Sequence, residues 1–280
     1  YLSEDEVLMP AERVGNEKGF TGARVLHFNL YGAQATLARV YWMKGDLDSA
    51  RIYADKVIRS NKFRFASKTS LNTFMQKTVS MEETIWGLYN AEVYSDWLTQ
   101  HVRRQGLGDL TTDFKSIYAY EGPTGKKDYR LDNWFGTYNR SGTPVDILVN
   151  VSDTTSLTTS YNGGPYLGTS MIRIPEMYYI MSEALLATGN AEGAMEYLDA
   201  VVDARGMEKF ADRTPLVDIT LSDIMAERRK EFIGEGQWWF CLKRLNSPVK
   251  LSGATGATIP GSDKIYVLPL PVEEEDYRPE

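Results

Sequence analysis

Cysteine and histidine are scarce in this sequence of 280 residues, which has one cysteine, Cys241, and two histidines, His27 and His101. A single cysteine cannot form an internal disulfide, and no CxxC or Cys/His pair offers a metal site. Neither histidine lies in a nucleophile-elbow or HExxH pattern, so histidine-based catalysis has little support. Cys241 stands in an aromatic run and is predicted to be a small, buried apolar residue.

Long hydrophobic runs and an excess of positive charge are also missing. No stretch approaches the roughly 20 consecutive apolar residues of a membrane-spanning helix, and no signal peptide or lipobox cysteine stands near Tyr1. The net charge of −7 argues against nucleic-acid binding, which usually requires a basic face. The sequence also lacks the GxGxxG and GxxxxGK(S/T) contexts of nucleotide-binding loops, so no cofactor is predicted.

Aromatic and apolar residues are plentiful. Hydrophobic residues make up 42% of the chain, which is enough to bury a large core. The 17 tyrosines and six tryptophans suit a carbohydrate- or peptide-binding surface. Tyrosines also pack in ordinary helical hairpins, so composition alone leaves both roles open.

The strongest periodic pattern predicts a helical hairpin after Arg173. Apolar residues recur at three- and four-residue spacing over 177–185 and again over 194–202, which is typical of two amphipathic helices. Gly189 separates the helices, because glycine tolerates the left-handed backbone at a helix end, and Gly206 ends the second one.

A similar hairpin is predicted over residues 28–60, with Gly45 at its turn. Aligning Gly45 with Gly189 matches small and apolar residues of the two hairpins. Two hairpins of about 34 residues with this pattern are typical of tetratricopeptide repeats. The long intervening segment excludes a tandem solenoid, in which the repeats are adjacent.

A third helix is predicted from Thr220, the N-cap, with Asp223 as its capping-box partner. Glu227 and Glu231 lie four residues apart on this helix and flank three cationic residues. This spacing favours ion pairs along the helix over a general acid.

Residues 61–172 are predicted to be loop-rich with short strands. Residues 82–88 form one expected strand, in which Trp86 packs into the core, and a second strand is expected between Val145 and Val151. Residues 111–120 are expected to be helical.

Several segments together resemble the SusD/RagB family of surface nutrient-binding lipoproteins of Bacteroidetes-type outer membranes. The first matching segment, Asp128-Tyr129-Arg130 with the following residues 131–135, resembles a family strand, and the last, Tyr266-Val267-Leu268-Pro269-Leu270-Pro271, resembles the closing strand of the family. The segments between them are Arg173-Ile174-Pro175-Glu176, Tyr178, Ser182-Glu183-Ala184, Gly189-Asn190, Glu227-Arg228-Arg229-Lys230-Glu231, Glu235-Gly236-Gln237, Trp239-Phe240 and Leu242-Lys243-Arg244.

The resemblance implies a mainly α-helical fold of tetratricopeptide-like hairpins with an inserted loop-rich region. Residues 1–280 would form a single SusD-like domain, divided into a hairpin at 28–60, the loop and short-strand region at 61–172 and the closing section at 173–280. The resemblance also implies that the sequence is a mature fragment without its N-terminal part and lipid anchor. The family usually has arginine where Trp238 stands and aspartate where Cys241 stands, so apolar packing is expected to replace an ion pair there.

Catalysis has weak support. A glycoside hydrolase needs two carboxyl groups converging on one pocket, and the pairs Asp128/Asp132 and Asp109/Asp113 have no spacing beyond that of an ordinary turn or helix. We therefore expect the protein not to be an enzyme.

A binding surface on the irregular loops is the stronger hypothesis. Glycans stack on aromatic faces and exchange hydrogen bonds with amides, carboxylates and guanidinium groups. Trp97 is the best single candidate for a stacking platform. For Trp134 the strand-like match favours core packing over ligand contact, and the run 238–240 is assigned to packing. The predicted ligand-binding residues are Tyr94, Trp97, Arg103, Asn133, Trp134, Tyr138, Tyr161 and Tyr166.

The function expected from this resemblance is oligosaccharide capture at the outer-membrane surface, followed by hand-over to a SusC-like TonB-dependent transporter. The membrane would be reached only through the N-terminal lipid anchor. A peptide or glycopeptide receptor is the alternative of the same class. A tetratricopeptide interaction scaffold and a glycoside hydrolase are the alternatives of other classes.

Overall fold

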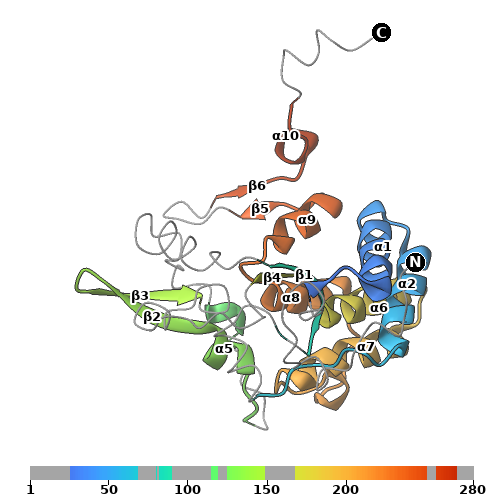
Figure 1. Ribbon diagram of the computed structural model, residues 1–280, viewed down its shortest axis with the longest axis horizontal. Coiled ribbons are helices and arrows are strands. Elements are labelled where there is room, and N and C mark those ends of the chain that lie inside the picture. The colour runs from blue at the N-terminus through green and yellow to red at the C-terminus, as the bar shows by residue number, and fades with distance from the viewer. Residues whose placement is uncertain are drawn as a thin grey trace.

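The computed structural model describes residues 26–68, 80, 82–89, 115–118, 125–148, 168–250 and 257–269, and the statements below concern these residues (Figure 1). Helices dominate, and the strands are short, so the predicted mainly α-helical fold with tetratricopeptide-like hairpins is confirmed.

The first hairpin consists of α1 (Leu30–Lys44) and α2 (Leu47–Arg59). Asn29 caps α1 by accepting a hydrogen bond from the backbone N–H of Gly32 at 2.9 Å. Gly45 ends the helix in the left-handed conformation, with φ of 84°. Small residues in both helices are fully buried, which lets the backbones approach closely: Ala35, Ala38, Ala50 and Ala54.

The second hairpin consists of α6 (Ile174–Ala187) and α7 (Ala191–Ala204), as the periodic pattern predicted. Gly189 has φ of 81° in the turn, and the Asn190 side chain caps α7. Helix α2 packs against α6, so the two hairpins lie side by side and share one core (Figure 1). Burial of their apolar faces is the main stabilising contribution.

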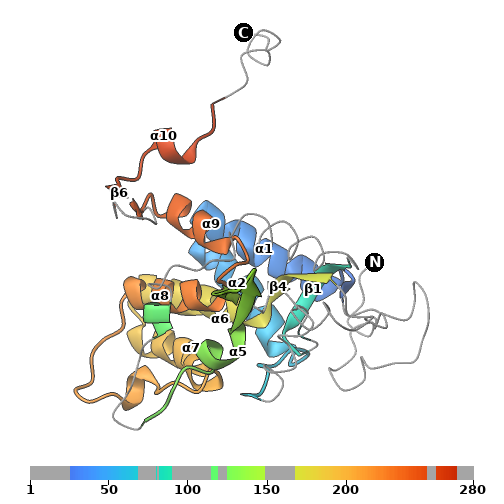
Figure 2. The same cartoon turned by 90° about the vertical axis from the view of Figure 1, so that its left-hand side faces the viewer.

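Two further helices pack beside the hairpins. In α8 (Leu221–Glu231), Thr220 and Asp223 form the predicted capping box. A turn then leads to α9 (Gln237–Arg244), which contacts α1 and α8 (Figure 2). Cys241 is buried in the core as predicted.

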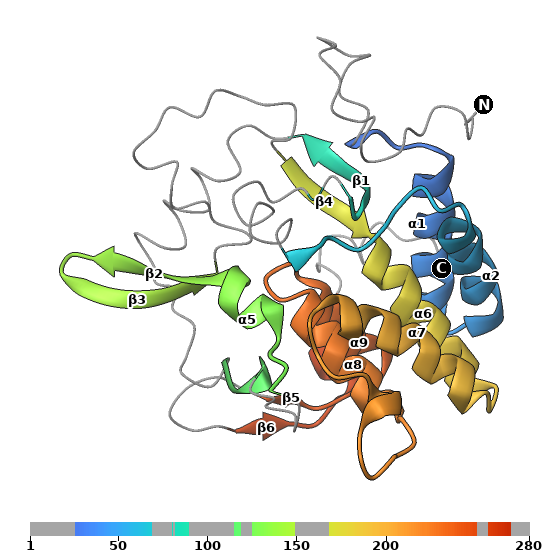
Figure 3. The same ribbon diagram turned by 90° about the horizontal axis from the view of Figure 1, so that it is seen from below.

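The described strands form three antiparallel pairs. These are β1 (Thr84–Tyr89) with β4 (Gly168–Arg173), β2 (Phe135–Arg140) with β3 (Thr143–Leu148), and β5 (Val249–Lys250) with β6 (Thr258–Ile259). The β2–β3 hairpin extends away from the helices, and β1–β4 lies against α1 and α6 (Figure 3). The remaining short elements are η4 (Lys115–Tyr118), α5 (Tyr129–Trp134), η6 (Phe210–Asp212) and α10 (Asp263–Tyr266).

Two strand predictions that rested on the family resemblance are wrong in the described residues. Residues 129–134 form helix α5, because Asp128 caps its N-terminus by accepting a hydrogen bond from the backbone N–H of Arg130 at 3.0 Å. Tyr266 ends helix α10 instead of opening a strand, and residues 267–269 are not in a strand. The strand predicted at 82–88 is confirmed as β1.

Two further predictions are tested in part. The helix expected at 111–120 is a 3₁₀ turn, η4, where it is described. The strand expected between Val145 and Val151 corresponds to β3, which ends at Leu148. The remaining residues of both segments lie outside the described ones.

Candidate functional site

The β1–β4 pair brings two predicted ligand-binding segments to one place. Tyr89, the last residue of β1, is the register partner of Gly168, the first residue of β4. The segment 90–114 therefore leaves the sheet at the same end where the segment 149–167 enters it. This end, defined by Tyr89 and Gly168, is called the loop end of the sheet below.

The two strands approach each other closely at Gly87. A Cβ atom on this residue would lie 2.5 Å from the carbonyl oxygen of Thr169 in the partner strand and 2.8 Å from the side chain of Leu26. The register is irregular on both sides of Trp86, which is typical of a β-bulge. Only glycine fits here without moving β1 away from β4.

Gly87→Ala is therefore expected to lower the free energy of unfolding by about 1–3 kcal/mol, because the strands must separate to admit the methyl group. Chemical denaturation measures this change. Equal stability of the wild type and Gly87→Ala would contradict the close approach.

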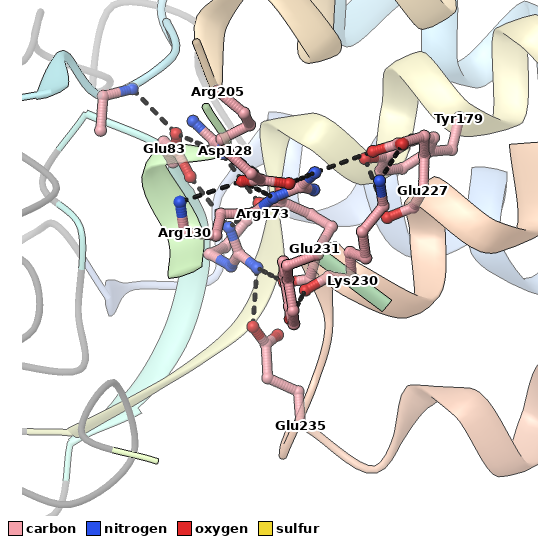
Figure 4. Close-up of polar contacts among 12 residues, drawn as sticks. Glu83, Asp128, Arg130, Arg173, Tyr179, Arg205, Glu227, Lys230, Glu231 and Glu235 are labelled. Carbon is pink, nitrogen blue, oxygen red and sulfur yellow. Dashed lines mark hydrogen bonds and ion pairs between the residues drawn. The ribbon is translucent and has the colours of Figure 1, made fainter. Parts of the chain in front are cut away.

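At the opposite end, the sheet is held by buried charges. Glu83 precedes β1, and Arg173 ends β4, where it pairs in register with Thr84. These residues belong to a set of side chains that converge from separate elements and that we call the ion-pair cluster (Figure 4). Its members are Glu83, Asp128, Arg130, Arg173, Arg205, Glu227, Lys230, Glu231 and Glu235.

Arg173 connects β4 to three other segments. Its Nη1 donates to Glu83 Oε2 at 2.9 Å and to Glu231 Oε1 at 2.7 Å. Its Nη2 donates to the backbone oxygen of Glu231 at 2.8 Å and to Glu235 Oε1 at 2.7 Å. One guanidinium group thus fixes the start of β1, the end of α8 and the turn before α9.

Arg130 and Arg205 complete the cluster around Glu231. Arg130 in α5 donates to Asp128, to Glu227 at 2.8 Å and to Glu231 at 3.1 Å. Arg205 after α7 donates to both carboxylate oxygens of Glu231, at 3.0 and 2.8 Å. Burial alone raises the pKa of Glu231, but Arg205 and Arg173 outweigh it and hold this pKa well below its ordinary value.

The cluster corrects the sequence-based interpretation of α8. Glu227 does pair with Lys230 along the helix. Its other partner, Arg130, and all the partners of Glu231 come from distant elements. Because Glu231 is fully buried and held ionised by several arginines, it suits a structural role and not that of a general acid.

A pocket of about 420 Å³ opens between α1, β4 and α9. Thr169 and Met171 of β4 line it, beside the loop end of the sheet. Phe240 of α9 forms part of its wall and is 50% exposed, and the neighbouring Trp239 is 43% exposed. Trp239 packs against Tyr266, with ring centroids 5.1 Å apart, in agreement with its predicted packing role, whereas Phe240 adds its exposed face to the pocket wall.

The SusD family model matches residues 60–259. The chain belongs to the SusD family. No curated protein sequence gave a match.

Solved structures show the same fold. A SusD-like carbohydrate binding protein from Bacteroides vulgatus matches 96% of this SusD-family chain with a TM-score of 0.65 and 17% identity. A SusD superfamily protein from Bacteroides thetaiotaomicron matches 89% of it with a TM-score of 0.65 and 23% identity. The aligned parts span 61% and 59% of those two chains, so the relatives are considerably longer.

Five of the predicted ligand-binding residues of this SusD-family protein lie outside the described residues. They are Tyr94, Trp97, Arg103, Tyr161 and Tyr166. The described structure thus leaves the prediction for these residues untested.

The other three predicted residues belong to α5 and β2. Trp134 is 0% exposed and packs against Ala66 and Leu148, in agreement with the packing alternative. Asn133 is buried, and its amide donates to the Tyr129 carbonyl oxygen at 2.6 Å. Tyr138 lies in β2 opposite Val145. Neither Trp134 nor Asn133 offers a surface for ligand stacking.

The pocket residues on α9 were missed by the sequence analysis, although helical periodicity contained a signal. Successive helical residues point about 100° apart, so three consecutive aromatic residues cannot share one face. Trp238 and Cys241 lie on the core side, while Trp239 and Phe240 turn outwards. Nothing local indicated that β4 and α1 would enclose a pocket beside Phe240.

Within the described part of the chain, no helix has both the length and the hydrophobicity needed to cross a bilayer. The same residues contain no group of three or more acidic, histidine or cysteine side chains placed to hold a metal ion.

Proposed function

We propose that this SusD-family protein binds an oligosaccharide with the segments that meet at the loop end of β1–β4. One observation carries the proposal: Tyr89 and Gly168 are register partners, so segment 90–114 begins beside the point where segment 149–167 ends. These segments contain Trp97, Tyr161 and other residues whose side chains suit sugar stacking and hydrogen bonding.

The fold supports a rigid mounting for such a surface. The ion-pair cluster fixes one end of the β1–β4 pair to α7 and α8, leaving the other end to present the two segments. Binding residues placed on loops above a rigid scaffold are a common arrangement in proteins. A SusD-like relative from Bacteroides vulgatus is described as carbohydrate binding, which favours a glycan over a peptide as the ligand.

The proposal extends to the cellular setting. We place the protein on the outer-membrane surface as a lipoprotein that transfers its ligand to a SusC-like TonB-dependent transporter. Co-purification of the protein with such a transporter from solubilised outer membranes tests this part. Recovery of the protein without any transporter would count against the hand-over.

Calorimetry against a panel of polysaccharides tests the binding function, with chromatography of the same mixtures as the test for catalysis. We expect binding without release of shorter products. Product release that disappears when one carboxylate is replaced would identify a glycoside hydrolase instead. Binding of peptides in place of glycans would identify a peptide receptor.

Trp97→Ala is expected to weaken glycan binding by about 10- to 100-fold. A nucleobase stacked on an aromatic side chain contributes on the order of 1–3 kcal/mol, and a pyranose ring of similar size is expected to contribute about as much. The melting temperature should stay nearly unchanged, as the side chain is proposed to face the ligand. Trp239→Ala is the matched control, because it removes an exposed tryptophan from α9. A large loss of thermal stability in Trp97→Ala would show that Trp97 belongs to the core.

A further inference from the structure

The pocket between α1, β4 and α9 has apolar walls and a polar rim. Trp42, Met43, Met171 and Phe240 supply the apolar surface. Its volume of about 420 Å³ lies within the range of small-molecule sites and accommodates a single sugar ring with room for substituents.

Three polar groups of the pocket lining are available to a ligand. The side chains of Gln237 and Thr169 form no hydrogen bond with any described residue, and Gln237 is only half-buried. Glu235 uses Oε1 to accept a hydrogen bond from Arg173 at 2.7 Å, while its Oε2 has no partner among the described residues. An amide, a hydroxyl and a carboxylate oxygen are the groups that exchange hydrogen bonds with sugar hydroxyls.

Two other residues of the lining, Trp42 and Arg39, are held in place by hydrogen bonds. Trp42 Nε1 donates to Glu183 at 2.6 Å, which holds the indole ring. The Arg39 guanidinium group donates to Glu176 Oε1 at 2.9 Å and to the carbonyl oxygen of Met171 at 2.7 Å. A site whose walls are held by buried partners loses little conformational entropy when a ligand binds.

The charges favour a neutral ligand. Among the described lining residues, Arg39 is the one cationic residue and Glu235 the one acidic residue, so their charges balance. Arg39 also pairs with Glu176, which it shares with Arg228. Glu235 presents a carboxylate oxygen, which would repel an anionic sugar. The exposed face of Phe240 offers the apolar surface on which the C–H face of a pyranose can stack.

We propose that this pocket binds one neutral pyranose ring of the oligosaccharide, as a subsite beside the loop end of the sheet. The proposal rests on the proposed glycan-binding function. Thr169, at the pocket, directly follows Gly168 at the loop end of the sheet. One oligosaccharide can therefore reach from the pocket to the loop end of the sheet.

The first test uses ligand-detected NMR with methyl glycosides of glucose, galactose and mannose as separate probes. Saturation transfer from the wild-type protein to at least one of them is expected, and it should be lost in the double variant Phe240→Ala/Gln237→Ala. The matched controls are Trp239→Ala, on the same helix but outside the pocket lining, and Val40→Ala, an exposed residue of α1 that also lies outside it. Both controls should retain the transfer.

The second test measures affinity for oligosaccharides of two to eight residues by calorimetry, using maltose-, laminari- and manno-series ligands. The double variant is expected to weaken the affinity for the longer ligands by about tenfold or more, and Trp239→Ala by less than twofold. If the wild type binds and Trp97→Ala weakens binding while the double variant matches the wild type, the pocket proposal is overturned and the proposed function stands. If no ligand of either test binds to the wild type, both are overturned.

Discussion

Replacing Glu231 with glutamine is expected to lower the free energy of unfolding by about 3–5 kcal/mol, the usual effect of removing one partner from a buried ion pair. Glu231 is fully buried and accepts hydrogen bonds from Arg130, Arg173 and Arg205. Glutamine keeps the shape but removes the negative charge. Each of the three guanidinium groups would then lose a buried carboxylate partner, so the cost of their desolvation would be compensated less well.

Urea or guanidinium unfolding of both proteins measures the difference. The matched control is Asp55→Asn, which breaks the Arg59–Asp55 pair on α2 at the surface. That pair spans one helical turn, and its loss is expected to change stability by about 0.5 kcal/mol or less. A Glu231→Gln effect as small as that of the control would show that the ion-pair cluster does not hold the domain together.

Acidification is expected to destabilise the protein steeply below about pH 4.5. Glu176 is fully buried, and although burial raises its pKa, Arg39 and Arg228 lower it from 4.5 to about 2. Because the pKa is lower in the folded state, the stabilisation is complete above about pH 4.5 and is lost as the pH falls to about 2. This one group contributes on the order of 3 kcal/mol at neutral pH. Glu231, whose pKa is also lowered, adds in the same direction.

Two carboxyl groups act in the opposite direction. Burial raises the pKa of Asp199 and of Glu235, despite backbone hydrogen bonds at the former and Arg173 at the latter. Their protonation stabilises the folded state, an effect present at low pH and lost as the pH rises through the folded-state pKa. They therefore reduce the acid sensitivity but do not reverse it, because Glu176 and Glu231 are the more strongly shifted groups.

Denaturant unfolding at a series of pH values from 7 to 2 measures the dependence. The variant Glu176→Gln is expected to be less stable at pH 7 and to show a shallower fall in stability between pH 4.5 and 2. Identical pH profiles for the variant and the wild type would exclude Glu176 as a source of acid sensitivity. The measurement needs no ligand, so it is independent of the proposed binding function.

Local patterns predicted most of the helical fold correctly. The capping box of Thr220 and Asp223 and the turn at Gly189 depend on residues within one helical turn of each other. Their consequences for the backbone are therefore readable from the sequence. Helix α5 was missed even though Asp128 is a good N-cap, because the family resemblance suggested a strand there.

The candidate site was less predictable, because it depends on contacts between distant parts of the chain. Arg130 and Glu231 are 101 residues apart in sequence, and no spacing rule connects them. The pairing of Tyr89 with Gly168 depends on the same long-range assembly. Core packing was predicted as an alternative for Trp134, but only the structure shows that Ala66 and Leu148, distant in sequence, cover its ring.

The sequence by itself determined the repeated hairpins, their caps and the family, because helical periodicity and glycine-ended turns act over a few residues. Only the tertiary structure decided which charges are buried together, which faces of Trp239 and Phe240 reach solvent and where a pocket forms. Those features depend on which elements meet, and burial, not sequence position, determines whether a carboxylate such as Glu231 becomes a structural anchor or a solvated surface charge.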